Sequence, residues 1–455
     1  MTRTRRAAPP AALLLCALAG SCQDDNPQAR NRQTCSYGPG ALASTTLADT
    51  GLTGAKIPID HFVLVMQENR TFDHYFSSLT VPGQTVDGAS PDAGNPDPRP
   101  GHAGETLARF HQGALCFDNP AESWEQVHRE VDDGGMDGFT AENAASDPTA
   151  DPAGLRSLGY YDESDLPYYY ALARAFAISD RHFASTLGNT YPNRLFYMAG
   201  TAFGVVSDVL PPYTDSTGEP YPNLFTLLDA AGVDWRFYAE GAPTLLLLLP
   251  TYIRDQDKVS PASRFYTDAQ SGNLPAISFV EGADTAGGAS SDEDPPADPQ
   301  LGQALVARIV AAVTGSPQWP SSALLFSYDE QGGFYDHVPP PRACVPDAIP
   351  PQDPQGGWQF DTLGLRVPLI AVSPYAKRGY VSHQITDHTS ILRLLEARFS
   401  LPALTRRDAN AEPPFDLFDF SHAELGVQLL PAATPDPDKA SACQLAYPPS
   451  GATRR

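Results

Sequence analysis

The stretch His61-Phe62-Val63-Leu64-Val65-Met66-Gln67-Glu68-Asn69-Arg70 decides the fold. Residues 62–66 are apolar, rich in β-branched side chains and too few for a helix, which predicts a strand buried on both faces. Such strands are typical of an open α/β sheet, where ligands bind beyond the carboxyl ends of the strands. Glu68 and Asn69 should therefore lie where a carboxylate and an amide oxygen can meet a hard cation. On these residues alone, a strand that ends in an ordinary polar turn is the simpler interpretation.

A second stretch, Ser322-Ala323-Leu324-Leu325-Phe326-Ser327-Tyr328-Asp329-Glu330-Gln331-Gly332-Gly333, has the same arrangement. A buried strand again ends in acids, and the two glycines permit a tight turn close to a ligand. Together the two strand ends supply Glu68, Asn69, Asp329 and Glu330, an oxygen-only donor set that suits Mg, Ca or Mn. Because buried carboxylates repel one another unless a cation lies between them, we expect one divalent metal ion here.

Five separated motifs carry a resemblance to a known family. They are Gln67-Glu68-Asn69-Arg70-Thr71-Phe72-Asp73-His74-Tyr75-Phe76, Gly135-Met136-Asp137-Gly138-Phe139, Gly188-Asn189-Thr190-Tyr191-Pro192-Asn193-Arg194, Tyr328-Asp329-Glu330 with Gly332-Gly333-Phe334-Tyr335-Asp336-His337-Val338, and Asp387-His388-Thr389-Ser390. In this order they resemble the bacterial phosphoesterase family that contains phospholipases C and a related acid phosphatase. The resemblance implies an α/β fold, an alkaline-phosphatase-like three-layer sandwich with a central, mostly parallel sheet, and metal-dependent hydrolysis of phosphoric esters.

The resemblance implies that Thr190 is the nucleophile and that its oxygen is a further cation ligand. A free threonine hydroxyl is a poor nucleophile, and direct contact with a cation activates it. Without the metal motifs, an N-cap for the helix that begins near Pro192 would be the simpler role of Thr190. Arg194 matches phosphate oxygens with its planar fork, and it could equally be the partner of a buried salt bridge.

Further roles follow from the same resemblance. The implied proton-transfer groups are His128 and His388, and the implied substrate contacts are Asn193, Arg194, Asp294 and His337. We expect His388 and His337 to support the site rather than to ligate the metal. Glu122 and Asp294 stand where the family has histidines. An aspartate cannot bring positive charge to a phosphoryl oxygen, although a protonated one can donate to a leaving group, so altered or reduced activity is expected.

The charge of the chain excludes one class of partner. With 54 acidic and 30 basic residues the net charge is −24, which is opposite to that of a nucleic-acid-binding protein. An acidic surface also disfavours adhesion to anionic lipid headgroups. The expected partner is therefore a phosphate-ester substrate, with a zwitterionic phospholipid headgroup among the options. The oligomeric state is left open.

The ends of the chain predict export and flanking segments. Residues 1–22 are typical of a signal peptide, with arginines ahead of an apolar run. The sequence before Cys22 resembles a lipoprotein cleavage box with one extra residue, so ordinary cleavage, a lipid anchor at Cys22 and a twin-arginine route stay open. We expect a periplasmic, secreted or lipid-anchored protein. Residues 23–56 are predicted to form an extended polar arm, 57–430 the catalytic domain and 431–455 a tail.

Four cysteines outside the signal, Cys35, Cys116, Cys344 and Cys443, predict two disulfides in an exported protein. Three pairings are open. Because Cys35 and Cys443 both lie outside the core motifs, we favour Cys35 with Cys443 and Cys116 with Cys344.

The sequence thus predicts an exported, metal-dependent phosphoric ester hydrolase of the phospholipase C type. An acid phosphatase is the alternative among enzymes, and the short chain beyond the last motif leans slightly toward a soluble substrate. The alternative from another class is a surface-anchored binding protein on a degenerate hydrolase scaffold, because Glu122 and Asp294 replace histidines.

Overall fold

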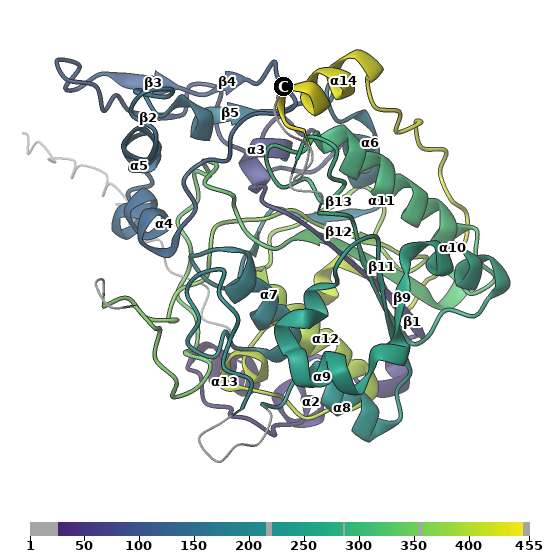
Figure 1. The fold of residues 1–455 in the computed structure, drawn as a ribbon. Helices are drawn as coiled ribbons and strands as arrows, with labels where there is room; N and C mark the ends of the chain where they lie inside the picture. Colours follow the sequence, from purple (N-terminus) through teal and green to yellow (C-terminus); the bar gives the residue numbers. More distant parts are fainter. Residues whose placement is uncertain (1–25, 215–220, 285–286, 354–356, 449–455) are drawn as a thin grey trace, which may run out of the picture.

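An eight-stranded sheet organises the protein, in the order β13-β6-β12-β11-β1-β10-β8-β9 (Figure 1). This computed structural model describes residues 26–214, 221–284, 287–353 and 357–448. The strands of the sheet are β1 His61–Gln67, β6 Ala177–Ser179, β8 Trp235–Ala239, β9 Val259–Pro261, β10 Ile277–Glu281, β11 Ser322–Tyr328, β12 Leu369–Val372 and β13 Tyr380–Ser382. Only β12 runs antiparallel to its neighbours, so the predicted, mostly parallel α/β sheet is confirmed.

Helices cover both faces of the sheet and complete three layers (Figure 1). One face carries α6 Pro167–Ala175, α10 Ala262–Ser271 and α11 Pro299–Thr314, and the other carries α7 Thr190–Ala199, α8 Leu224–Ala231, α9 Leu249–Arg254 and α12 His388–Phe399. In α11, Leu305, Ile309 and Val313 recur at four-residue spacing and are fully buried, which is why this segment forms a helix that packs on the sheet.

Besides short 3-10 helices, further α-helices and strands lie outside these layers. They are α1 Pro27–Gln33, α2 Ala43–Thr46, α3 Phe72–Phe76, α4 Trp124–Val131, α5 Phe139–Ser146, α13 Arg406–Ala409, α14 Pro437–Ala446, β2 Gly94–Pro96, β3 Thr106–Ala108, β4 Phe110–His111, β5 Gly159–Tyr160, β7 His182–Phe183 and β14 Thr386–Asp387. Within the described ranges, no helix combines the length and the apolar composition that crossing a bilayer requires. The predicted signal peptide, residues 1–22, lies outside the described residues and stays a prediction.

The register of the central strands places their polar ends together. β1 pairs in parallel with β11, and Gln67 lies opposite Tyr328 in the last rung. The next residues along each strand are Glu68 and Asp329, and the amide of Asp329 donates to the carbonyl of Gln67. On its other side β1 pairs with β10, which ends in Glu281. The sheet therefore delivers acids from three neighbouring strands to one edge.

The predicted extended arm at residues 23–56 is wrong for the part that the structure describes. Helix α2 packs on α12 and α1 packs on α2, with Ala43, Thr46 and Leu47 buried. Arg32 is buried as well and forms ion pairs of 2.8 Å with Asp49 and with Glu412. Because its charges are paired, this polar segment can fold against the core. The sequence does not show that Glu412, far along the chain, lies beside Arg32.

The favoured disulfide pairing is also wrong. The bonds join Cys35 to Cys344 and Cys116 to Cys443. Each bond ties one end of the chain to the catalytic domain, instead of joining the two ends to each other. The predicted tail accordingly contains α14, which carries Cys443, so residues 437–446 are part of the folded body. Cys35 and Cys443 both lie outside the core motifs, but this shared location did not indicate which cysteine lies close to each of them in space.

We expect peptide mapping of the unreduced protein to recover the pairs Cys35–Cys344 and Cys116–Cys443. Replacing either pair with serines should lower the free energy of unfolding by about 2–5 kcal/mol, because each bond closes a long loop of the unfolded chain. Thermal unfolding without reductant measures this loss. Recovery of a peptide that joins Cys35 to Cys443 would contradict the structure.

Candidate active site

Arg194 of α7 lies between the acids at the strand ends. Its Nη2 is 2.7 Å from Oε1 of Glu68, its Nε is 2.9 Å from Oδ2 of Asp329, and its Nη1 is 3.0 Å from Oε1 of Glu281. The convergence predicted for Glu68 and Asp329 is therefore present. Arg194 takes the role of buried salt-bridge partner, which the sequence left open beside phosphate binding.

Thr190 is the first residue of α7, one helical turn before Arg194. Residues four apart lie on the same helix face, so Thr190 is on the face that Arg194 turns toward the acids. Asn189, not Thr190, is the N-cap residue. The amide of Tyr191 donates to Oδ1 of Asp208 at 2.9 Å, so a carboxylate already lies at the positive end of this helix.

Asn193 holds the loop that leads to Thr190. Its side-chain oxygen accepts from the amides of Ser185 and Thr186, and its amino group donates to the carbonyls of Thr186, Gly188 and Asn189. Because the Asn193 side chain is fully buried and fully bonded, it holds this loop in place. These bonds give no support to its predicted role as a substrate contact.

Several acids crowd this edge of the sheet and shift one another's pKa. Burial raises the pKa of Glu68 well above its usual range despite Arg194, with Asp329, Asp292 and Asp294 adding to the rise. Burial and the charge of Asp294 raise the pKa of Asp292 to about 8. Burial, opposed by Arg70 and reinforced by Asp329, raises the pKa of Asp294 to about 7.

Two more acids belong to the same space. Burial raises the pKa of Glu122 well above its usual range, and Asp294 is the charge that adds most to the rise. Burial likewise raises the pKa of Glu330, with Glu122 and Asp329 as its repelling neighbours. Such mutual repulsion is what a bound cation removes.

Asn69 has an oxygen to offer such a cation. Its Nδ2 donates to Oδ1 of Asp294 at 2.6 Å and to Oε2 of Glu122 at 3.4 Å. Its Oδ1 is buried without a hydrogen-bond partner, and the same is true of Oε1 of Glu330. A buried acceptor without a donor is costly unless something else satisfies it. The donor set, all oxygen and rich in carboxylates, fits a hard divalent cation.

The strand-end acids are nevertheless held apart. Among the described residues, three groups of His, Asp or Glu have ligand atoms within 4.8 Å of one another: Asp73 with Asp336 and His337, Asp97 with His102 and Glu105, and His111 with Asp162 and Asp165. The strand-end acids form no such group, because the Arg194 guanidinium separates Glu68 from Asp329.

His388 contacts the backbone at the end of β11. It is fully buried at the start of α12, and its Nε2 donates to the carbonyl of Asp329 at 2.6 Å. A carbonyl can only accept, so the proton is on Nε2 and Nδ1 is the free acceptor. Burial lowers the pKa of His388. The structure thus places it against the backbone of Asp329.

His128 and His337 lie in other surroundings. His128 stacks on Trp358 with ring centroids 4.3 Å apart, and its Nδ1 lies 2.7 Å from the carbonyl of Trp124. His337 forms a bond of 2.6 Å with Asp73, which also pairs with Arg366. In these contacts neither histidine joins the strand-end acids, so proton transfer by His128 and substrate binding by His337 gain no support.

Two residues of the site were missed from the sequence. Glu281 ends β10 as Glu68 ends β1, so the strand-end argument applied to a third strand would have found it. Asp292 follows no strand, and its place beside Glu68 depends on the bond from the Glu68 amide to the Asp292 carbonyl. No sequence pattern predicted that contact.

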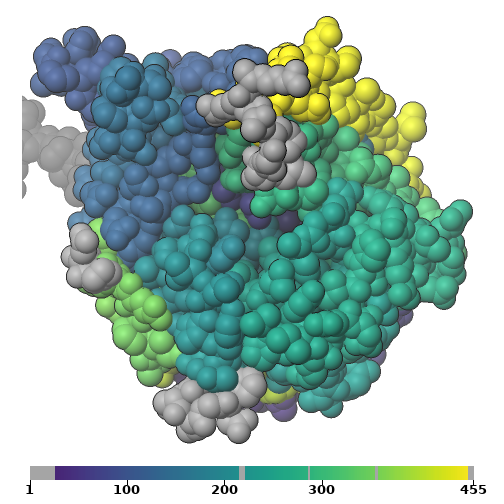
Figure 2. Space-filling model, in the orientation of Figure 1, coloured from purple at the N-terminus to yellow at the C-terminus, as the bar shows by residue number. Residues whose placement is uncertain are grey.

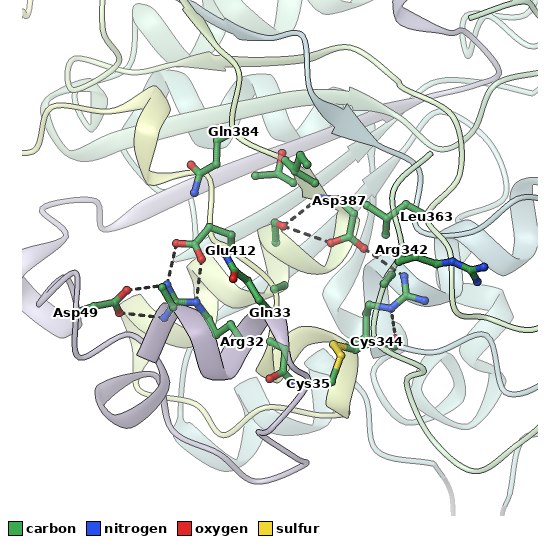
Figure 3. Close-up of a pocket in the computed structure, with 18 residues that line it drawn as sticks. Arg32, Gln33, Cys35, Asp49, Arg342, Cys344, Leu363, Gln384, Asp387 and Glu412 are labelled. Carbon is green, nitrogen blue, oxygen red and sulfur yellow. Dashed lines mark hydrogen bonds and ion pairs between the residues drawn. A yellow bond between two sulfur atoms is a disulfide. The ribbon is translucent and has the colours of Figure 1, made fainter. Parts of the chain in front are cut away.

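The molecular surface is hollowed above this edge. In Figure 2 the blue, teal and green parts of the chain surround a hollow with purple atoms at its bottom, and purple is the colour of β1, whose carboxyl end leads to α3 (Figure 1). The cavity in Figure 3, of about 530 Å³, is a different one. It is lined by Arg32, the Cys35–Cys344 disulfide and Asp387, and the strand-end acids are not part of its wall.

Known proteins are similar to this chain over most of its length. Residues 59–402 match the Phosphoesterase family. The chain is 32% identical over 376 residues to non-specific phospholipase C6 of Arabidopsis thaliana, covering 77% of this chain and 70% of that protein. It is 31% identical over 435 residues to phospholipase C B of Mycobacterium tuberculosis, covering 84% and 79%. A protein in the alkaline phosphatase superfamily from Vibrio parahaemolyticus matches in structure with a TM-score of 0.35 at 9% identity, covering 54% of this chain and 63% of that one.

The raised pKa of Asp294, about 7, predicts a pH-dependent effect of Asp294→Asn in the metal-free protein. A carboxyl whose folded pKa is raised contributes stability at low pH, and this contribution is lost as the pH rises through the folded value. Asp294→Asn should therefore raise the free energy of unfolding by at least about 1 kcal/mol at pH 8.5, with a smaller gain at pH 5, because the loss of stability runs from the usual pKa of 3.8 up to the folded value.

Thermal unfolding in the presence of a chelator measures this difference. Asp257→Asn, a change at an exposed acid, is the matched control and should alter stability at neither pH. Destabilisation by Asp294→Asn at pH 8.5 would mean that the folded protein stabilises the charge.

Proposed function

The chain belongs to the Phosphoesterase family and is a hydrolase that acts on phosphoric esters, and we propose that it is an exported, phospholipase C-like enzyme that depends on one divalent cation. Its cation ligands in this proposal are Glu68, Asn69, Asp329, Glu330 and the Thr190 oxygen. The relatives named as phospholipases C support the substrate class, since a third of the residues are shared along most of both chains.

One observation carries the metal site: a crowded group of acids with raised pKa values surrounds buried oxygens that have no donor. Asn69 Oδ1 and Glu330 Oε1 are such oxygens. Arg194 supplies one positive charge to Glu68, Glu281 and Asp329, which leaves negative charge uncompensated. A divalent cation that prefers oxygen ligands would offset this negative charge and would also contact the two buried oxygens. When bound, it would offset charge on a phosphoryl group and activate a hydroxyl beside it.

Residues of this chain would perform the remaining steps. Thr190, fixed at the start of α7 by the Asn193-bonded loop, would attack the phosphorus, release the leaving group and carry the phosphoryl group until water removes it. Arg194, on the same helix face, would hold Glu68 and Asp329 in place. His388 would orient Asp329 through its backbone carbonyl.

Glu122 and Asp294 would change the way the leaving group is handled. Both contact Nδ2 of Asn69, and burial raises both pKa values, so each holds a proton to a higher pH than an exposed carboxyl does. A protonated carboxyl donates to a leaving oxygen, which is the role that a histidine would otherwise fill. We therefore propose that this protein keeps its activity but turns over more slowly than an enzyme with histidines at these positions. Diesters and monoesters are both substrates to test.

Thr190→Ala should abolish turnover, with a loss on the order of 10³-fold or more in kcat/KM, because the nucleophile is removed. Thr190→Ser should retain part of the activity. The measurements are release of p-nitrophenol from p-nitrophenyl phosphate and from its diester, and release of choline phosphate from phosphatidylcholine. Thr226→Ala, which removes a threonine hydroxyl near the start of α8, is the matched control. Full activity of Thr190→Ala would exclude this nucleophile.

Removal of the cation should stop turnover, and Mg²⁺, Ca²⁺ or Mn²⁺ should restore it. Glu330→Gln should weaken cation binding on the order of 10- to 100-fold or more, while its remaining oxygen still accepts from the Gly332 amide. Calorimetric titration of the chelator-treated protein measures the affinity. Cation binding without turnover of any ester would favour the binding-protein alternative, and turnover that survives chelation would exclude a required metal.

A further inference from the structure

Glu293 is an acid that the proposed mechanism does not use. It is fully buried, and its carboxylate accepts hydrogen bonds from three tyrosine hydroxyls: Tyr169 at 2.5 Å, Tyr75 at 2.6 Å and Tyr328 at 2.9 Å. The Gln67 side chain adds a fourth bond of 3.3 Å. The donors come from β1, α3, α6 and β11, so one carboxylate joins four separate elements.

Two of these donors immediately precede the proposed cation ligands. Gln67 is followed by Glu68 and Asn69, and Tyr328 is followed by Asp329. Glu293 is therefore bonded to the last residue of each central strand. Because β1 and β11 end side by side, a group bonded to both limits how far their tips can separate.

The segment around Glu293 is bonded to four consecutive residues of the first motif. Gln67 donates to the Ser291 carbonyl, the Glu68 amide to the Asp292 carbonyl, Asn69 to the Asp294 carboxylate and Arg70 to the Glu293 carbonyl. This pairing brings Asp292 and Asp294 to the acids of the strand ends. The side chain of Glu293, between them in sequence, is bonded on the opposite side, within the core.

The backbone of Glu293 has an unfavourable conformation that these bonds maintain. Its φ of +77° lies in the left-handed region, which costs a non-glycine residue about 1 kcal/mol or more. Gly302 of α11 leaves room for the side chain, because a Cβ there would come within 2.2 Å of Glu293 Cγ. Such a conformation persists only where the surrounding contacts determine it.

We propose that Glu293 is a positioning residue for the cation site, an inference that rests on the proposed function. Its bonds to Gln67 and Tyr328 set the spacing between Glu68–Asn69 and Asp329–Glu330, and its backbone turns Asp292 and Asp294 toward them. It touches neither substrate nor cation. Residues that orient metal ligands from behind typically change metal affinity about 10- to 100-fold when mutated.

The experiment compares two fully buried tyrosines that each donate to a carboxylate, which is buried in Glu293 and half-buried in Asp268. Tyr328→Phe removes a bond to Glu293, and Tyr238→Phe removes the 2.8 Å bond from β8 to Asp268 of α10, outside the site. Both variants lose one hydroxyl from a fully buried ring. Affinity for Mg²⁺, Ca²⁺ and Mn²⁺ is measured by calorimetry on the chelator-treated full chain, together with thermal unfolding. Glu293→Gln is the second variant, because it keeps the side-chain shape.

The expected result is that Tyr328→Phe and Glu293→Gln weaken cation affinity about 10-fold or more. Tyr238→Phe should lower the unfolding temperature by no more than Tyr328→Phe, because water can reach the half-buried Asp268, and should leave the affinity within about twofold. Unchanged affinity in both site variants, or an equal loss in Tyr238→Phe, overturns the positioning role while the proposed function stands. A wild-type protein that binds none of the three cations overturns both.

Discussion

One guanidinium shared by three carboxylates is the constraint on which this site depends. Arg194 comes from α7, and its partners Glu68, Glu281 and Asp329 come from three adjacent strands. Breaking a buried ion pair by removing one partner typically costs about 3–5 kcal/mol, because the remaining charge stays buried and unpaired. The helix and the sheet edge are therefore locked together. Thr190 and Arg194 belong to the same helix, so the ion pairs of Arg194 also fix the position of Thr190 relative to the acids.

Charge balance explains why so much of the chain converges on one edge. Arg194 cannot neutralise Glu68, Glu281 and Asp329 alone, and Glu330, Asp292 and Asp294 add further negative charge nearby. Asp294 shows how the fold tolerates this group, because its raised pKa lets it keep a proton to a higher pH and its carboxyl also accepts from Asn69. A site that binds a cation needs such an excess in advance, since the excess is what the ion relieves.

The sequence predicted those parts of the fold that depend on neighbours in the chain. Apolar runs identified β1 and β11, and their polar ends located Glu68, Asn69, Asp329 and Glu330. What it could not predict depends on distant partners. Arg32 is buried because Glu412 lies beside it, and His128 stacks on Trp358 instead of joining the acids. Glu293 lies in a loop of small and acidic residues, and nothing local shows that three tyrosines hold it.

The acids at positions 122 and 294 also have a structural consequence. An amide side chain has one amino group and one oxygen, so the neighbours of the amino group decide where the oxygen is left. Asp294 and Glu122 can accept from Nδ2 of Asn69, and they leave Oδ1 as the atom without a partner. Either carboxyl, protonated or not, keeps an oxygen that can accept, so Asn69 is left able to offer its own oxygen to a cation.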